Sequence, residues 1–134
     1  MLVANICIGL LGALIFVLGF SVSMVRGKYQ RIIGCPEDPS NNLYKIIRAH
    51  ANTAEYVPAL MIMMYILSRG SVSNWLNSLF VVVTASRYLY ILGMFRSRSL
   101  EYQNPIRFIC TLNTYIIGFI MAVEIIKQAV SAEL

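Results

Sequence analysis

Four long apolar stretches, separated by three polar connections, make up the hydrophobic pattern of the chain. They cover approximately residues 2–25, 44–68, 75–95 and 105–130. An α-helix rises about 1.5 Å per residue, so each stretch can cross the roughly 30 Å hydrocarbon core of a bilayer as one helix. We therefore predict an all-α integral membrane protein, in which residues 1–134 form a single bundle of four transmembrane helices.

The composition supports a membrane location. Of the 134 residues, 58% are hydrophobic and 13% are charged, which leaves too little polar surface for a soluble globule of this size. The first stretch lacks a positively charged start and is longer than the apolar part of a secretory signal, so we expect a retained helix. The three cysteines, Cys7, Cys35 and Cys110, form no CxxC pair and predict neither a disulfide framework nor a metal site.

Basic residues concentrate in or beside the first and third connections. They are Arg26, Lys28, Arg31, Lys45, Arg48, Arg96, Arg98 and Arg107. By contrast, the second connection has only Arg69 and the tail only Lys127. The positive-inside rule then places the first and third connections in the cytoplasm and both termini outside. The net charge of +5 reflects this topology and contact with membrane lipid, and we expect no nucleic-acid partner.

The second stretch carries polar residues at a depth where hydrocarbon is expected. At about 100° per residue, Arg48, Asn52 and Glu55 fall within a stripe roughly 60° wide, with Tyr56 at its edge. Such a stripe cannot face lipid, so it predicts a polar pocket between helices. A hydrogen-bond network that only holds the bundle or its oligomer together is the alternative.

The third and fourth stretches add further polar groups near the cytoplasmic side. Arg87 and Tyr90 share a face, and Arg87 lies at a depth similar to that of Glu55, so it is either the counter-ion of Glu55 or a ligand contact. Asn104 is a suitable helix cap before Pro105, which places Arg107 in the first turn of the fourth helix.

The chemistry of these side chains suggests a type of ligand. Arginines bind carboxylates through forked donors, a glutamate can hold an ammonium group, and an amide such as Asn52 suits a peptide group. The pocket therefore fits a small anionic peptide or a zwitterion.

The segment RAHANTAEYVP, residues 48–58, resembles the second-helix signature of the MAPEG family, the membrane-associated proteins in eicosanoid and glutathione metabolism. Arg87 and Tyr90 followed by Gly93 resemble its third helix, and residues 104–107 resemble the opening of its fourth helix. The resemblance extends over essentially the whole chain. It implies a homotrimer that binds glutathione as a co-substrate between neighbouring subunits, on the cytoplasmic side and without a metal.

The resemblance also implies a function and a set of site residues. The residues that would bind glutathione are Arg26, Arg48, Asn52, Glu55, Tyr56, Arg87 and Tyr90. Catalysis would be that of a glutathione transferase, with peroxidase activity left open: an arginine lowers the pKa of the thiol, and the thiolate attacks a hydrophobic electrophile arriving from the bilayer. We expect Arg107 to hold the thiolate, because a helix amino terminus adds positive partial charge, with Arg98 as the other candidate.

Two residues depart from the leukotriene synthase of the family. Met94 stands where that enzyme has a tyrosine, and Glu101 falls close to where its arginine would align, so we do not expect leukotriene synthesis. A non-catalytic lipid-binding scaffold of the same fold is a second hypothesis, and a small proton-coupled exporter that uses Glu55 is a third. The compact length suggests a bacterial inner membrane.

Overall fold

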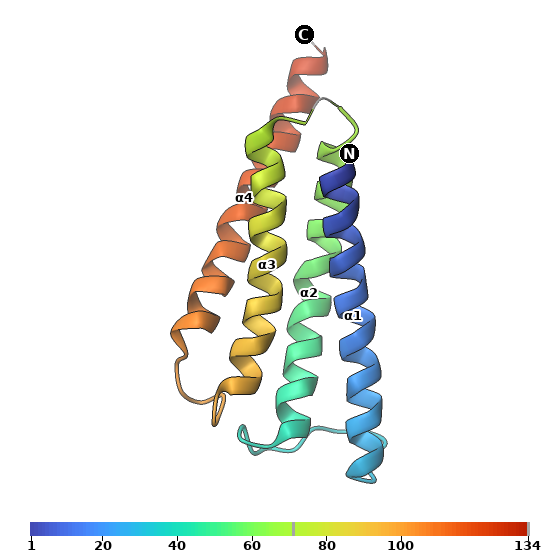
Figure 1. Ribbon diagram of the computed structural model, residues 1–134, viewed down its shortest axis with the longest axis vertical. Coiled ribbons are helices and arrows are strands. Elements are labelled where there is room, and N and C mark those ends of the chain that lie inside the picture. Colours follow the sequence, from blue (N-terminus) through green and yellow to red (C-terminus); the bar gives the residue numbers. More distant parts are fainter. Residues whose placement is uncertain (71, 134) are drawn as a thin grey trace.

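The computed structural model describes residues 1–70 and 72–133, and these residues form a bundle of four helices (Figure 1). The helices are α1 (Leu2–Lys28), α2 (Asn42–Leu67), α3 (Asn74–Arg96) and α4 (Pro105–Glu133). The α1–α2 and α3–α4 connections lie at one end of the bundle, whereas the chain termini and the α2–α3 connection lie at the other (Figure 1). We call the first of these ends the basic end, because most of the arginines and lysines are there.

Side-chain caps set where two of the helices begin. The side-chain oxygen of Asn41 accepts a hydrogen bond of 2.8 Å from the backbone N–H of Leu43, at the start of α2. At the start of α4, the side-chain oxygen of Asn104 accepts one of 2.9 Å from the N–H of Ile106. Each cap satisfies a backbone donor that has no partner within the helix. Pro105 follows Asn104 as the first helical residue, as the sequence predicts.

The end of α1 is a Schellman motif, a turn in which the chain reverses through a left-handed residue. Gln30 has a φ of 51° and donates its backbone N–H to the carbonyl of Gly27 at 3.2 Å. The N–H of Arg31 donates to the carbonyl of Arg26 at 3.1 Å. These two bonds satisfy carbonyls in the last turn of α1 and fold the chain back over the helix end.

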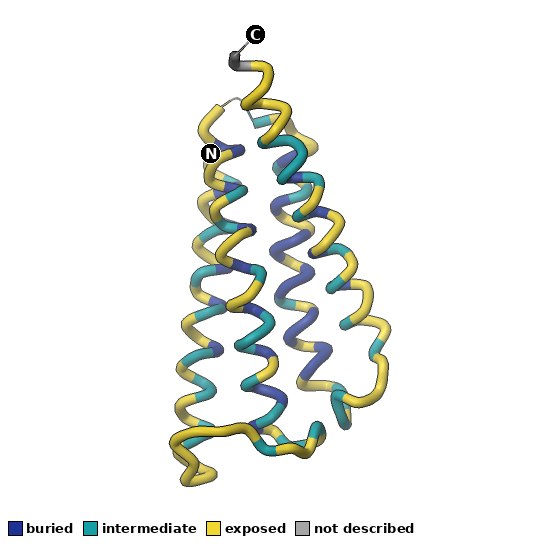
Figure 2. Tube along the Cα trace, turned by 180° about the vertical axis from the view of Figure 1, so that it is seen from behind, coloured by how far each residue is buried: buried dark blue, intermediate teal, exposed yellow. Residues whose placement is uncertain are grey.

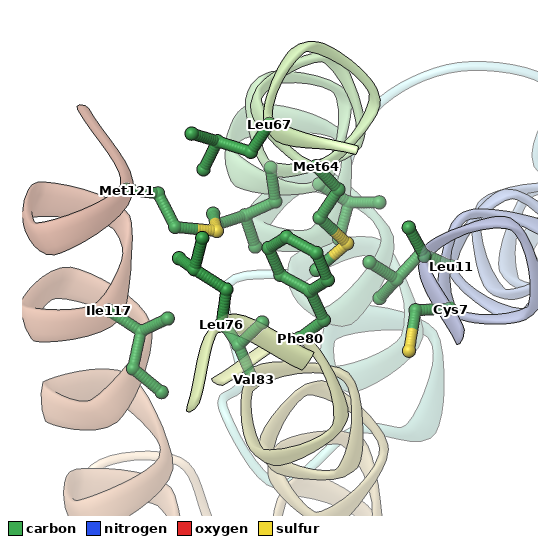
Figure 3. Close-up of a cluster of buried hydrophobic side chains, with 12 residues drawn as sticks. Cys7, Leu11, Met64, Leu67, Leu76, Phe80, Val83, Ile117 and Met121 are labelled. Atoms are coloured by element: carbon green, nitrogen blue, oxygen red, sulfur yellow. The ribbon is translucent and has the colours of Figure 1, made fainter. Parts of the chain in front are cut away.

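The four helices are arranged around an apolar core. α1 packs on α2 and α3, α4 packs on the same two helices, and no contact joins α1 to α4 in the described part of the chain. In the half of the bundle near the termini, Phe80 of α3 lies beside Met64 of α2, with Leu11 of α1 on one side and Met121 of α4 on the other (Figure 3). The core therefore takes one apolar face from every helix.

The outer surface of the bundle is also apolar, which suits a membrane protein and not a soluble one. Phe16, Phe20 and Phe119 are each more than two-thirds exposed. Within the described chain, α1, α3 and α4 are long and apolar enough to span a bilayer, whereas α2 has similar length but lower hydropathy because of polar residues in its first half. α2 continues through Pro58, packed beside the other three helices. The chain is thus an all-α integral membrane protein, as predicted.

Candidate functional site

Arg87 of α3 is more deeply buried than any other charged side chain that the structure describes, with 1% of its surface exposed. Its Nη2 donates a 2.8 Å hydrogen bond to the side-chain oxygen of Asn52 on α2. The guanidinium carbon lies 5.0 Å from the ring centroid of Tyr90 and 5.9 Å from that of Tyr56. Aromatic faces at these distances stabilise a cation that has lost its water. The Nε of Arg87 is buried and has no hydrogen-bond partner among the described residues.

Tyr115 of α4 extends this group and was not identified from the sequence. Its hydroxyl oxygen lies 3.1 Å from that of Tyr56, and the two rings meet edge to face with centroids 5.4 Å apart. Either hydroxyl can donate this hydrogen bond. We call Asn52, Tyr56, Arg87, Tyr90 and Tyr115 the Arg87 cluster. It joins α2, α3 and α4.

Counting depth along the helices could have suggested Tyr115. Tyr115 lies about 15 Å along α4 from Pro105, and Tyr56 lies about 21 Å along α2 from Asn42, a difference of about one helical turn. Both helices start at the basic end, so the two rings are at comparable depth. A tyrosine in an apolar helix is, however, equally typical of an interfacial belt, and hydropathy alone does not distinguish a belt tyrosine from a site tyrosine.

Arg107, in the first turn of α4, lies beside a cavity of about 200 Å³ at the basic end. The other lining residues are Tyr90, Gln103, Asn104, Phe108 and Thr111. The Nη1 of Arg107 lies 3.5 Å from the carbonyl oxygen of Leu100 and 3.4 Å from that of Tyr102, at the long limit for hydrogen bonds. Its Nε has no partner. The guanidinium is thus weakly held, and Tyr90 is shared by this cavity and the Arg87 cluster.

Gly93 explains how Arg107 reaches this position. A Cβ atom at Gly93 would lie 3.1 Å from the Cγ of Arg107, closer than most such contacts. The missing side chain lets the start of α4 approach α3 and lets the stem of Arg107 lie against it. This is a packing reason for a glycine next to the site.

Arg48 and Glu55 are exposed on the surface of α2 and do not join the Arg87 cluster. The predicted alternative in which Glu55 is the counter-ion of Arg87 is wrong for this structure: the ion pair found in the described residues joins Lys127 to Glu124 at 3.6 Å. The reason is angular. Glu55 and Tyr56 lie on opposite sides of Asn52 around α2, and Arg87 approaches from the Tyr56 side.

Arg26 and Arg98 lie apart from the Arg87 cluster in the single chain. Arg26 donates from Nη1 to the carbonyl of Ile32 at 2.9 Å and lines a separate cavity of about 300 Å³ under the α1–α2 connection. The side chain of Arg98 is exposed in the α3–α4 connection. Only 6% of Lys45 is exposed, and its Nζ donates to the carbonyls of Ser97 and Arg98 at 2.9 and 3.0 Å. Lys45, which the sequence suggested only as a topology signal, therefore holds that connection against α2.

The chemistry of the described groups is that of anion and amide recognition. Guanidinium, phenol and amide groups converge between α2, α3 and α4, and no cluster of His, Cys, Asp or Glu with metal-ligand geometry occurs among the described residues. The arrangement can bind carboxylates and peptide groups and can stabilise a thiolate near an arginine.

Comparison with known proteins identifies the family of the chain. The MAPEG family profile matches residues 4–127, nearly the whole chain and all four helices. No curated protein sequence matches. The matched segment contains every residue of the Arg87 cluster as well as Arg107. The chain therefore belongs to the MAPEG family, which includes glutathione transferases and related membrane proteins.

Proposed function

We propose that this protein is a glutathione transferase of the membrane. Peroxidase activity would use the same thiolate differently: the sulfur would attack a peroxide oxygen, and a second glutathione would complete the disulfide. The observation that supports the proposal is the Arg87 cluster, in which a buried guanidinium has one amide partner, two aromatic neighbours and an unpaired Nε. A buried cation in a membrane helix is costly, so a guanidinium with one side-chain hydrogen bond and an unpaired Nε favours a binding site over a purely structural network.

The active form we propose is a homotrimer. Arg48 and Glu55 are charged, yet they are exposed on α2 within the apolar envelope of the bundle. Charged side chains at this depth are not stable against lipid and need a protein partner or a water-filled cleft. A second copy of the chain placed against α2 would provide the protein partner, and a water-filled cleft would lie between the two copies. Bound between the copies, glutathione would meet Arg48 and Glu55 on one side and the Arg87 cluster on the other.

Within this interface the charges match those of glutathione. Arg48 and Arg87 would bind its carboxylates, Glu55 its ammonium group, Asn52 its peptide groups, and the tyrosines its remaining polar atoms. Arg26, remote from the cluster in one chain, would reach the site from the neighbouring copy. Both termini lie at the end opposite the basic connections (Figure 1), so by the positive-inside rule we propose that the termini are outside and the site faces the cytoplasm. The host membrane that we propose is a bacterial inner membrane.

The chemical step we propose is deprotonation of the glutathione thiol followed by attack of the sulfur on an electrophilic carbon. The thiol proton passes to water, and a sulfur electron pair forms the new carbon–sulfur bond. In a substitution the electron pair of the broken bond leaves with the displaced group, and in an addition to a double bond it is protonated. A free thiol has a pKa of about 8.5, and a nearby guanidinium lowers it toward neutral pH. Arg107 suits this role better than Arg98, because it lies in the first turn of α4, lines a cavity and is weakly held.

The electrophile would be hydrophobic and enter from the bilayer. A narrow groove of about 160 Å³ runs between α2 and α4 next to Tyr56 and Tyr115, and Gly118 forms part of its wall. Its lining is mostly apolar, and it lies beside the polar cluster. A lipid-soluble compound in this groove would place its reactive carbon toward the thiolate.

The experiment is ultraviolet difference absorbance on adding glutathione to the purified protein in detergent. A thiolate band near neutral pH is expected, and it should disappear in Arg107→Ala while calorimetry still detects glutathione binding. In Arg98→Ala the band should persist. A band that survives Arg107→Ala and is lost in Arg98→Ala transfers the role to Arg98. Absence of both band and binding would refute the glutathione proposal.

A non-catalytic lipid-binding protein is the second candidate. It is favoured by an apolar groove of about 580 Å³ between α1 and α3, lined mainly by side chains such as Val3, Ile6, Leu10 and Val81. An acyl chain would fit there. Glutathione binding without a thiolate band or turnover would support this candidate over the transferase.

A further inference from the structure

The first part of the α1–α2 connection displays two large apolar side chains in an unusual place. Ile32 is 91% exposed and Ile33 is 83% exposed, although both lie in a polar connection and not on a membrane-spanning helix. Tyr29, just before them, is also exposed. The connection crosses the basic end of the bundle, and its first part, residues 27–35, is exposed throughout (Figure 2). An apolar pair left in water at this point would be unfavourable.

The contacts of Arg26 fix the depth of this pair. The apolar run of α1 ends at Val25, so Arg26 marks the boundary between hydrocarbon and headgroups. The side chain of Arg26 donates to the carbonyl of Ile32 at 2.9 Å, and the carbonyl of Arg26 accepts from the N–H of Arg31. Because of these bonds the chain reverses its direction directly after α1. It turns back, so that the carbonyl of Ile32 lies 2.9 Å from the Nη1 of Arg26.

The charges around the pair indicate what lies against it. Lys28 and Arg31 flank the turn and are exposed, and the chain has no acidic residue before Glu37. Basic side chains beside exposed apolar and aromatic ones are the composition of a segment that binds an anionic membrane surface. Glu37 and Asp38 belong to the second part of the connection, where the carbonyl of Asp38 accepts from the N–H of Asn41 at the start of α2.

We propose that residues 28–33 form an anchor in the bilayer interface at the basic end. Ile32 and Ile33 enter the layer between the headgroups and the acyl chains, and Lys28 and Arg31 bind the phosphates of anionic lipids around it. The Schellman motif at Gln30 gives the segment its reversed path and thereby its position at the surface. This role does not depend on glutathione or on any catalytic activity.

Fluorescence quenching in vesicles measures the depth of the anchor directly. Trp75 is the only tryptophan and lies at the other end of the bundle, so a Trp75→Phe background with Ile33→Trp carries one reporter at the proposed site. In vesicles of phosphatidylcholine and phosphatidylglycerol, lipids brominated near the headgroup should quench it more strongly than lipids brominated near the chain end. Aqueous iodide should quench it weakly.

Two other outcomes would overturn the proposal. Strong quenching by iodide with little quenching by brominated lipid would mean that the segment projects into water. Quenching by neither would mean that a second copy of the chain covers it. Glu37→Trp in the same background is the matched control, because the second part of the connection should remain accessible to iodide.

The charge part of the proposal has its own test. Thermal stability of the reconstituted protein should increase with the phosphatidylglycerol content of the vesicles, because lipid that binds the folded state stabilises it. The increase should be largely lost in Lys28→Gln/Arg31→Gln and retained in Arg69→Gln, a basic residue exposed at the opposite end. If the increase in thermal stability with phosphatidylglycerol is the same in Lys28→Gln/Arg31→Gln as in Arg69→Gln, the anchor has no preference for anionic lipid.

Discussion

The hydrogen bond between Asn52 and Arg87 should contribute more to stability than an ordinary contact between membrane helices. It is 2.8 Å long, its donor is charged, and Arg87 is 1% exposed, so no water can replace the lost partner easily. Hydrogen bonds to charged groups contribute about 1.5–3 kcal/mol, whereas interhelical hydrogen bonds in membranes average about 0.6 kcal/mol. We therefore expect a coupling energy of about 2 kcal/mol between the two side chains.

A double-mutant cycle measures this coupling without glutathione. Asn52→Leu removes the acceptor and leaves a buried cation, so it should destabilise strongly on its own. Arg87→Met removes the cation, and in its presence Asn52→Leu should cost little. The free energy of unfolding can be measured for the four proteins in mixed micelles with increasing dodecyl sulfate, followed by circular dichroism. The coupling energy is the difference between the destabilisation caused by Asn52→Leu in the wild-type protein and that caused by Asn52→Leu in the Arg87→Met protein.

A second pair between helices provides the control. The side-chain nitrogen of Asn113 on α4 donates to the hydroxyl of Ser86 on α3, but at 3.4 Å and without a charge. The cycle of Asn113→Leu and Ser86→Ala should give about 0.6 kcal/mol or less. If the coupling of Asn52 with Arg87 does not exceed this control value, the buried guanidinium has other partners and our account of the cluster is wrong.

Three further predictions concern the connections at the basic end. Gln30→Gly should raise the free energy of unfolding by about 1 kcal/mol, measured in the same micelle titration, because glycine adopts a positive φ without steric cost. Lys45→Met keeps the volume of the side chain but loses the two hydrogen bonds to carbonyls, so it should lower the free energy of unfolding by about 1.5–3 kcal/mol. An unchanged free energy of unfolding would show that those bonds contribute nothing. Ser40 donates backbone and side-chain hydrogen bonds to Asp38, and these bonds lower the pKa of that carboxyl. Ser40→Ala should therefore reduce thermal stability at pH values above the ordinary Asp pKa of 3.8. The loss of stability should vanish as the pH falls through the lowered pKa of Asp38.

The helices could be predicted from the sequence because their determinants are local. Apolar runs of sufficient length, the Asn104 cap and Pro105 each act within a few residues of the chain. The four helices of the structure begin and end within three residues of the predicted stretches. Of the polar stripe predicted on α2, Asn52 is half-buried and contacts Arg87, whereas Arg48 and Glu55 are exposed in the single chain.

The partners within the site could not be predicted because they depend on the relative rotation of helices. Glu55 and Tyr56 differ by about 100° around α2, and that angle alone decided which of them approaches Arg87. Hydropathy does not resolve such an angle. Arg26 illustrates a second limit, since its partner is a backbone carbonyl positioned by a turn at Gln30. No side-chain pattern in the sequence encodes that acceptor.

The two connections at the basic end differ in how well they should tolerate an insertion, because the α3–α4 connection is bonded to α2. Lys45 holds two successive carbonyls of that connection, and the N–H of Leu100 donates to the carbonyl of Pro39 at 3.2 Å. A tag or fluorescent protein inserted between Arg98 and Glu101 would have to break these bonds and would displace the start of α4. The stretch 34–37, exposed except at the half-buried Pro36, has no such attachment in the described contacts, so it is the position where the chain can be lengthened or labelled with least damage.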